Sequence, residues 1–175
     1  MEKEKIVDVG FGWASIGFLQ YIDDNLYDIV VLSKDDNFVY SPLLAQNVKK
    51  NYDLTIPIKS LKKNLTFVQD NVEHVDFQKK IVKTNHNYDF LIFSHGAEVN
   101  TFQIPGVEKY TYYLKTFEDS LAIKEKLQEL PHSSKIAVIG CGLAGSELVG
   151  SLSDMKKFQI FAIDALERPV ITFDK

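Results

Sequence analysis

Two stretches of the chain align without a gap and decide the fold: Lys5-Ile-Val-Asp-Val-Gly-Phe-Gly-Trp-Ala-Ser15 and Lys135-Ile-Ala-Val-Ile-Gly-Cys-Gly-Leu-Ala-Gly145. In each, an apolar run typical of a buried parallel strand ends at a glycine, and a segment with helical spacing follows. A second apolar run comes after each helical segment, Tyr27–Leu32 in the first copy and Phe158–Ile163 in the second. Strand, glycine turn, helix and strand form a βαβ unit, so the sequence predicts two of them.

A glycine-rich turn in this setting predicts a site for the pyrophosphate of a dinucleotide. The first glycine permits the tight turn, the second lets the backbone approach the phosphates, and the third lets helix and strand pack closely. The helix N-terminus adds unpaired N–H groups and the positive end of its dipole. The second copy has all three glycines, whereas the first has serine in the third place: Gly140, Gly142 and Gly145 against Gly10, Gly12 and Ser15. Two ordinary strand-to-helix turns are the alternative, but two such turns in one chain are a specific signal.

An acidic residue near the end of the second strand of such a unit binds the adenosine ribose and favours NAD over NADP. In the second copy Asp164 holds this place, with an ordinary surface aspartate as the alternative. In the first copy the place holds Ser33, followed by Lys34, Asp35 and Asp36. A serine offers the ribose a weaker hydrogen bond than a carboxylate does.

Asp8 departs from the pattern of a buried strand. It lies inside the first apolar run, where valine or isoleucine is expected. An unpaired carboxylate in that place costs several kcal/mol or stays protonated. Two interpretations remain open at this point, namely a local polar pairing and an erosion of the fold.

The segments between the two copies predict short strands and one further helix. The helix of the first copy, Gly12–Asp23, is expected to bury Ile16, Leu19 and Ile22. Ser33–Asn64 is irregular, and Thr101–Tyr110 is a linker. The further elements are a short helix at Ile58–Lys63, strands at Thr66–Gln69, Val72–Phe77, Lys80–Thr84 and Tyr88–Phe93, and a helix at Phe117–Leu130. The predicted fold is α/β: a Rossmann-like unit with inserted antiparallel strands, followed by the start of a second Rossmann-like unit.

Composition and charge exclude several classes of protein. Hydrophobic residues make up 45% of the 175 residues, enough for a packed core. The net charge of −4 and a single arginine, Arg168, argue against a nucleic-acid surface. Cys141 is the only cysteine, so an internal disulfide and a thiolate metal cluster are excluded. The four histidines have no ligand spacing, and no metal site is expected.

Nothing in the sequence predicts a membrane-spanning or targeting segment. Met1-Glu-Lys-Glu-Lys-Ile6 leads directly into a strand and has neither an apolar signal region nor an arginine-rich transit composition. No stretch approaches the roughly 20 apolar residues that a spanning helix needs. We therefore expect a soluble chain, or one that is at most peripheral to a membrane.

Further motifs resemble the type II, non-proton-pumping NADH:quinone dehydrogenases in their order and spacing. They are Gly10-Phe-Gly-Trp-Ala14, Phe38-Val-Tyr-Ser-Pro-Leu-Leu44, Gly96-Ala-Glu-Val-Asn-Thr-Phe102, Ile104-Pro-Gly-Val107, Tyr113-Leu-Lys-Thr-Phe-Glu-Asp119, Gly140-Cys-Gly-Leu-Ala-Gly-Ser-Glu147, Asp164-Ala-Leu166 and Phe173-Asp-Lys175. Members of that family are peripheral membrane flavoproteins that pass electrons from NADH through FAD to a quinone. The resemblance thus implies FAD and NADH as cofactors, a quinone as electron acceptor, and no protein nucleophile.

The resemblance also assigns residues to each cofactor. For FAD it implies that Gly10, Gly12, Trp13 and Ala14 hold the diphosphate and that Ser33 lies near the adenosine ribose. It places Pro42 and Leu43 near the flavin, and Ser94, Gly96 and Ala97 where the chain leaves the flavin domain. For NADH it implies a diphosphate turn at Gly140, Gly142 and Gly145, and Glu147 near the contact between nicotinamide and flavin. The alternative for Glu147 is a first-turn acid favoured by the helix dipole.

The resemblance further implies two incomplete domains, an FAD-binding domain at residues 1–110 and the start of an NAD-binding domain at 111–175. Members of the family continue well beyond this length, so we expect a fragment, a remnant or a partner-dependent subunit, with uncertain activity of its own. Membrane contact is expected only through later segments, on the inner mitochondrial or bacterial cytoplasmic membrane, and a homodimer stays open.

Two other functions remain open. One is another flavoprotein reductase of the same superfamily, such as one serving ferredoxin or sulfide. The disulfide-reductase and sulfide branches need cysteines beside the flavin, and Cys141 is elsewhere. The other is a non-catalytic nucleotide-binding or interaction remnant, which Asp8 and Ser15 favour. Retention of flavin discriminates between the remnant and the enzymes.

Overall fold

The computed structural model of the chain describes residues 3–83 and 85–168. Two features expected from the sequence reach beyond them. The motif Phe173-Asp-Lys175 lies outside the described residues, and so does Thr84, the last residue of the predicted strand Lys80–Thr84.

The described residues form two compact units. Those up to Val39 and from Thr55 to Glu98 belong to the first unit. Those from Tyr40 to Leu54 and from Val99 onward belong to the second unit. The chain therefore enters the second unit, returns to the first, and enters the second again. The assignment of residues 1–110 and 111–175 to two cofactor domains stays a prediction.

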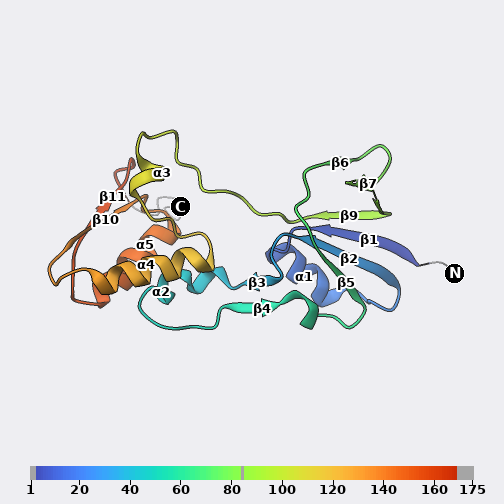
Figure 1. Cartoon of the computed structure of the whole chain (residues 1–175), viewed down its shortest axis with the longest axis horizontal. Coiled ribbons are helices and arrows are strands. Elements are labelled where there is room, and N and C mark those ends of the chain that lie inside the picture. The colour runs from blue at the N-terminus through green and yellow to red at the C-terminus, as the bar shows by residue number, and fades with distance from the viewer. Residues whose placement is uncertain (1–2, 84, 169–175) are drawn as a thin grey trace. The chain divides into compact units, whose positions relative to one another are not determined.

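The first unit is built on a four-stranded parallel sheet in the order β5-β2-β1-β9 (Figure 1). Its strands are β1 (Glu4–Val9), β2 (Tyr27–Ser33), β5 (Leu65–Gln69) and β9 (Phe90–Phe93). All three pairings are parallel, and α1 (Trp13–Tyr21) connects β1 to β2. The predicted βαβ unit is confirmed, and its crossover leads to the neighbouring strand.

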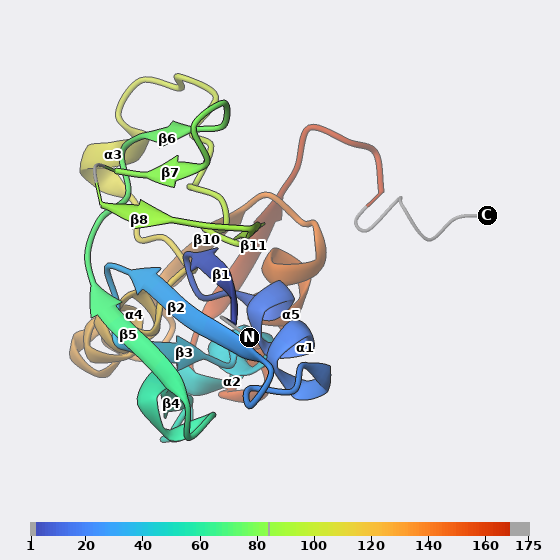
Figure 2. The ribbon, with the colours of Figure 1, turned by 90° about the vertical axis from the view of Figure 1, so that its right-hand side faces the viewer.

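The two faces of this sheet bury different apolar clusters. Figure 2 shows the elements that cover them, with α1 on one side of the sheet and the antiparallel strands on the other. On one face, β1 and β2 pack against the antiparallel strands through Val7, Val9, Val30, Leu32, Val82 and Tyr88. On the other face, β2 packs against α1 and a short helical turn through Leu19, Ile29, Val31 and Ile58. Both faces are covered, which explains why β1 and β2 are nearly continuous apolar runs.

The buried side of α1 differs in one position from the prediction. Leu19 is buried and Ile22 packs against the same cluster, as expected. Ile16 is only half-buried and is not part of that cluster. Ser15 is fully buried instead, because the helix turns the residue after Ala14 toward the sheet.

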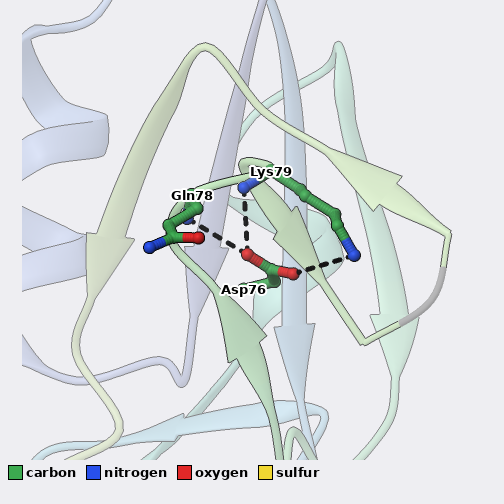
Figure 3. A network of polar contacts seen from close by, with 3 residues as sticks. All are labelled: Asp76, Gln78 and Lys79. Atoms are coloured by element: carbon green, nitrogen blue, oxygen red, sulfur yellow. Dashed lines mark hydrogen bonds and ion pairs between the residues drawn. The ribbon is translucent and has the colours of Figure 1, made fainter.

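The inserted strands form a three-stranded antiparallel sheet of β6 (Val75–Asp76), β7 (Ile81–Val82) and β8 (His86–Asn87). β6 and β7 are shorter than the strands predicted at Val72–Phe77 and Lys80–Thr84, and β8 was not predicted. The turn from β6 to β7 is held by Asp76, whose Oδ1 accepts hydrogen bonds from the backbone N–H groups of Gln78 at 3.1 Å and Lys79 at 2.9 Å (Figure 3). Its Oδ2 is 3.5 Å from Lys79 Nζ. These contacts, above all the Lys79 backbone N–H, lower the pKa of Asp76.

A small antiparallel pair completes the first unit. It consists of β3 (Asn37–Val39) and β4 (Thr55–Pro57), and η2 (Ile58–Ser60) follows it. The predicted helix at Ile58–Lys63 is therefore a single turn.

The second unit contains the second βαβ repeat. It consists of β10 (Lys135–Ile139), α5 (Leu143–Asp154) and β11 (Gln159–Ile163), with β10 and β11 parallel. The predicted amphipathic helix is α4 (Phe117–Glu129), and it begins with a capping box. In that box Thr116 Oγ1 accepts from the Asp119 backbone N–H at 3.1 Å, and the Asp119 side chain accepts from the Thr116 backbone N–H at 2.8 Å.

Three short helical segments of this unit were not expected from the sequence. They are η1 (Ser41–Leu43), α2 (Leu44–Asn47) and α3 (Val107–Tyr110). The first two lie in the stretch expected to be irregular, and α3 lies in the expected linker. The segment with α2 belongs to the core of the unit, because Val48 packs with Leu127, Val138 and Leu152. Asn47 Nδ2 also donates to Ser120 Oγ at 2.9 Å, and both residues are buried.

Asp8 forms a buried polar network with two serines. The carboxyl is fully buried, and its Oδ1 accepts a hydrogen bond from Ser94 Oγ at 3.1 Å. Ser94 Oγ is also hydrogen-bonded to Ser15 Oγ on α1. Asp8 Oδ2 has no hydrogen-bond partner among the described residues. The structure therefore favours local polar pairing over erosion of the fold.

Burial raises the pKa of Asp8 from 3.8 to about 6, against the opposing effect of the Ser15 and Ser94 hydroxyls. Between these two pH values the folded chain keeps a proton that the unfolded chain has lost. The free energy of unfolding therefore decreases as the pH rises from about 4 to about 6, by about 3 kcal/mol from this group, and then levels off.

We predict that Asp8→Asn removes this part of the pH dependence. The free energy of unfolding of the variant minus that of the native chain should increase by about 3 kcal/mol between pH 4 and pH 7, as measured by urea unfolding. Asp76→Asn is the control: the pKa of Asp76 is lowered, so this variant should lose stability relative to the native chain as the pH rises toward about 4, and the difference should stay nearly constant between pH 4 and pH 7. A constant difference between Asp8→Asn and the native chain across this pH range would contradict the prediction.

Candidate functional site

The glycine turn of the first unit leaves β1 through a backbone conformation that favours glycine. Gly10 has φ +86°, and its N–H donates to the Leu32 carbonyl on β2 at 2.8 Å. A Cβ on Gly10 would lie 2.5 Å from His95 N and 2.7 Å from the Ser94 carbonyl carbon. Gly12 then caps α1, and this cap makes no side-chain hydrogen bond. The turn therefore needs glycine at Gly10 for two reasons, its φ and the close backbone of the Ser94–His95 segment.

The second turn has the same geometry. Gly140 has φ +89°, and its N–H donates to the Ile163 carbonyl on β11 at 2.8 Å. Gly142 caps α5 as Gly12 caps α1, with ψ −167° against −165°. Each cap carbonyl accepts the N–H four residues on, Gly12 from Ile16 and Gly142 from Ser146. The internal repeat seen in the sequence is thus a repeat of backbone structure.

The third position of the turn differs between the copies. At Gly145 a Cβ would overlap the Gly140 carbonyl group, with 2.9 Å to its carbon. At Ser15 the first turn accommodates a whole side chain, which is fully buried. The helix and strand are therefore held together by close backbone contact in the second copy and by a polar side chain in the first.

A cavity of about 450 Å³ lies at the carboxyl ends of the parallel strands in the first unit. Of the predicted FAD residues, six line it: Gly10, Gly12, Ser33, Ser94, Gly96 and Ala97. Ligands of open α/β sheets bind at this edge, and the volume is within the usual range of about 300–1,000 Å³ for small-ligand sites. The sequence analysis missed other lining residues, including Asp70, Asn71 and His95, which follow β5 and β9.

The cavity has few cations. Its described lining includes Lys34 beside the acidic residues Asp35, Asp70 and Glu98. Asp70 is paired with Lys83 at 2.5 Å, and that hydrogen bond is the largest of the effects that lower the pKa of Asp70. A bound diphosphate would therefore be stabilised mainly by backbone N–H groups and the α1 dipole. Ser33 Oγ accepts from the Asp35 backbone N–H at 3.3 Å, which places the ribose candidate and a carboxylate side by side.

Four predicted FAD residues do not line this cavity. Trp13 packs edge-on against Phe38, with ring centroids 5.1 Å apart, and Ala14 is exposed on α1. Pro42 and Leu43 lie in η1 of the second unit. Their assignments to the cofactor stay predictions.

Asp164 lies directly beside the second glycine turn. Its Oδ2 accepts a hydrogen bond from the Cys141 backbone N–H, and its Oδ1 accepts one from the Leu166 N–H at 2.8 Å. These bonds, the Leu166 bond first, lower the pKa of Asp164 and keep it a carboxylate. The acid predicted to bind a ribose is thus held at the end of β11 next to Gly140 and Gly142.

The second unit also contains a larger, mostly apolar cavity of about 940 Å³. The three glycines of the second turn line it, together with all of β10 and parts of the segment from Val99 to Lys115. Asp164 and Glu147 do not line it. Glu147 is exposed on α5, beyond the first helical turn, which contains no acidic residue. The interpretation of Glu147 as a first-turn acid is therefore wrong, and its role near the nicotinamide stays a prediction.

The described residues contain no group of three or more histidine, cysteine, aspartate or glutamate side chains placed to hold a metal ion. None of the helices in the described part of the chain has the length and apolarity to cross a membrane.

Comparison with known proteins extends the similarity over nearly the whole chain. The chain is 28% identical over 187 residues to the external alternative NAD(P)H-ubiquinone oxidoreductase B4 of Arabidopsis thaliana mitochondria, covering 88% of this chain and 32% of the relative. It is 26% identical over 220 residues to the external NADH-ubiquinone oxidoreductase 2 of Saccharomyces cerevisiae mitochondria, covering 100% and 40%. The chain therefore spans about a third of the length of the curated relatives it matches.

Solved structures agree in fold. NDH2 from Plasmodium falciparum in complex with NADH superposes with a TM-score of 0.83 at 29% identity, covering 98% of this chain and 44% of that one. The water-forming NADH oxidase of Lactobacillus brevis gives a TM-score of 0.79 at 23% identity, covering 96% and 41%. The sequence model of the pyridine nucleotide-disulphide oxidoreductase family matches residues 4–175. With two glycine turns that share their backbone geometry, the chain belongs to the pyridine nucleotide-disulphide oxidoreductase family.

Proposed function

We propose that this chain forms the FAD-binding unit and the start of the NADH-binding unit of an NADH:quinone oxidoreductase. The observation that carries the proposal is the repeated turn. Gly10 and Gly140 share a positive φ and a hydrogen bond to the next strand, and each leads into a helix whose cap is glycine. Two dinucleotide sites in one chain suit an enzyme that brings two dinucleotides together. The proposed reaction is that of the relatives described above, which are named NAD(P)H- and NADH-ubiquinone oxidoreductases.

The first unit fits an FAD. In this proposal the backbone at Gly10 and Gly12 and the start of α1 hold the diphosphate, and Ser33 holds the adenosine ribose with Asp35 beside it. Gly96 and Ala97 border the same cavity, where a small side chain leaves room for the cofactor. Trp13, Ala14, Pro42 and Leu43 are assigned to FAD from the family resemblance alone.

The second unit fits the diphosphate of NADH at Gly140, Gly142 and Gly145. A Cβ at Gly142 would have no described atom within 4 Å, so the space in front of the turn is open. The Asp164 carboxylate is fixed beside this turn and is ionised, as a hydrogen-bond acceptor for ribose hydroxyls must be. Glu147, exposed on α5, is the proposed residue near the nicotinamide.

Bound FAD supplies the redox chemistry, as the acceptor of a hydride from NADH and the donor of electrons to a quinone. The contribution of this chain is binding and orientation. The two turns fix the diphosphates, and Ser33 and Asp164 fix the two adenosine ends. The described chain needs no nucleophile for this reaction. Association with the inner mitochondrial or bacterial cytoplasmic membrane, and a homodimer, belong to the proposal for the whole protein.

Asp8 and Ser15 are the two residues that favour the remnant hypothesis in the sequence. Both are members of one buried hydrogen-bonded network, which accounts for them without an erosion of the fold. A reductase serving a different acceptor shares both cofactor sites, so it differs from the proposal only in the acceptor. Assays with quinones and with ferredoxin distinguish the two.

We expect the purified chain to retain FAD after desalting, with the visible spectrum of a flavoprotein, and NADH to bleach that spectrum. The visible absorbance is read before and after NADH is added without oxygen. Retained flavin that NADH leaves oxidised would remove the NADH site from the proposal. A chain that emerges colourless would show that these 175 residues do not hold FAD by themselves.

We expect Gly142→Ala to weaken NADH binding at least tenfold, because its Cβ fills space that the diphosphate needs. The substitution should leave folding nearly unchanged, since φ at Gly142 is −66° and no described atom lies within 4 Å of the new Cβ. Gly150→Ala, on the same helix and equally unobstructed, is the matched control and should bind NADH normally. Calorimetric titration measures the Kd, and equal affinity of the two variants would count against a diphosphate at this turn.

A further inference from the structure

The third position of the first turn carries a serine where the second turn has no room for a side chain. Residues 5–15 align with 135–145, so Asp8 corresponds to Val138 and Ser15 to Gly145. In the second copy the two positions are neighbours, since a Cβ added to Gly145 would lie 3.7 Å from Val138 Cγ1. In the first copy the pair is joined through hydroxyl and carboxyl groups. The two substitutions therefore occur at neighbouring positions in space.

Neither substitution is favourable alone. Ser15 and Asp8 are both fully buried, and a buried hydroxyl or carboxyl without partners loses its hydration uncompensated. Together with Ser94 they form hydrogen bonds that partly compensate this loss: Ser94 Oγ is bonded to Ser15 Oγ and, at 3.1 Å, to Asp8 Oδ1, while Asp8 Oδ2 has no partner among the described residues. The three residues belong to three elements, α1, β1 and the segment after β9.

Ser94 connects this network to the glycine turn. Its N–H donates to the Val9 carbonyl at 2.8 Å, directly before Gly10. Its carbonyl oxygen would lie 3.1 Å from a Cβ on Gly12, and its carbonyl carbon borders Gly10. The backbone of Ser94 thus covers both glycines of the turn, while its side chain is fixed to the helix and the strand that the turn connects.

We propose that Asp8, Ser15 and Ser94 act as one unit that replaces the third glycine and positions the Gly10–Gly12 turn for a diphosphate. In the second copy, contact of Gly145 with the Gly140 carbonyl holds the helix close to the turn. In the first copy, the network sets the distance of α1 from β1 and holds the Ser94 backbone against the glycines. The three are positioning residues. Asp8 and Ser15 do not line the cavity, and Ser94, which does, acts on the turn through its backbone.

The coupling of Asp8 to Ser15 does not depend on the ligand, whereas its effect on FAD rests on the proposed function. The test therefore has a readout in the chain without cofactor. Hydrogen–deuterium exchange of the amides from Gly10 to Ser15 reports how often the turn opens. The same amides of the second turn, Gly140 to Gly145, serve as an internal reference for any global loss of stability.

We expect Asp8→Val and Ser15→Gly each to speed exchange at the first turn at least tenfold relative to the second turn. Each leaves part of the network without its partner. The double variant Asp8→Val/Ser15→Gly recreates the pair found in the second copy, and its exchange should return to within about threefold of the native rate. In the same series the Kd for FAD should rise at least tenfold in the single variants and recover in the double variant.

Ser120→Ala is the control substitution. Ser120 is fully buried and hydrogen-bonded to Asn47 in the second unit, away from the network. In a double variant, the factor by which Ser120→Ala speeds exchange should therefore multiply with the factor for Asp8→Val. A double variant Asp8→Val/Ser15→Gly that exchanges at least as fast as the product of the single effects overturns the proposal. If the native chain does not bind FAD, these residues do not hold the cofactor by themselves, and the exchange series still decides whether the network holds the turn.

Discussion

The structure depends on one backbone constraint, which is met twice. A chain that leaves a parallel strand and starts a helix within three residues must turn back across the end of the strand. Gly10 and Gly140 make this turn with a left-handed φ, and each donates its N–H to the last part of the neighbouring strand. That hydrogen bond ties the turn to the sheet and leaves the helix N-terminus facing the strand ends. In open α/β folds, a turn and helix N-terminus in this arrangement are where a dinucleotide diphosphate binds.

How closely the helix lies against the turn is a second constraint, and the two units meet it differently. The second unit uses the small size of Gly145, which lets the backbone of α5 contact Gly140. The first unit uses hydrogen bonds among Asp8, Ser15 and Ser94. The polar solution places a carboxyl in a core of valine and isoleucine, and it makes the stability of this unit sensitive to pH, because burial raises the pKa of Asp8 to about 6.

The surroundings of the two turns differ as much as their third positions do. The first turn opens into a mixed polar and apolar cavity that gathers residues from the ends of four strands. The second lies beside a larger apolar cavity along β10, with the Asp164 carboxylate held on the turn by the Cys141 and Leu166 N–H groups. The same backbone motif is therefore combined with different side chains. This difference is consistent with two different dinucleotides, FAD in the first unit and NADH in the second.

The sequence by itself determined the local structure of this protein. Apolar runs, glycine spacing and helical periodicity are short-range signals, so β1, β10, α4 and both glycine turns were predicted within a few residues. The tertiary structure decided what depends on contacts between distant segments. Ser94 is hydrogen-bonded to Asp8, 86 positions away in the sequence, and Asn47 to Ser120, 73 positions away. The segment with α2 belongs to the second unit, although the residues before and after it in the sequence belong to the first. No local pattern encodes such pairs, because the partner that makes a buried aspartate or serine favourable is chosen only when the strands and helices pack.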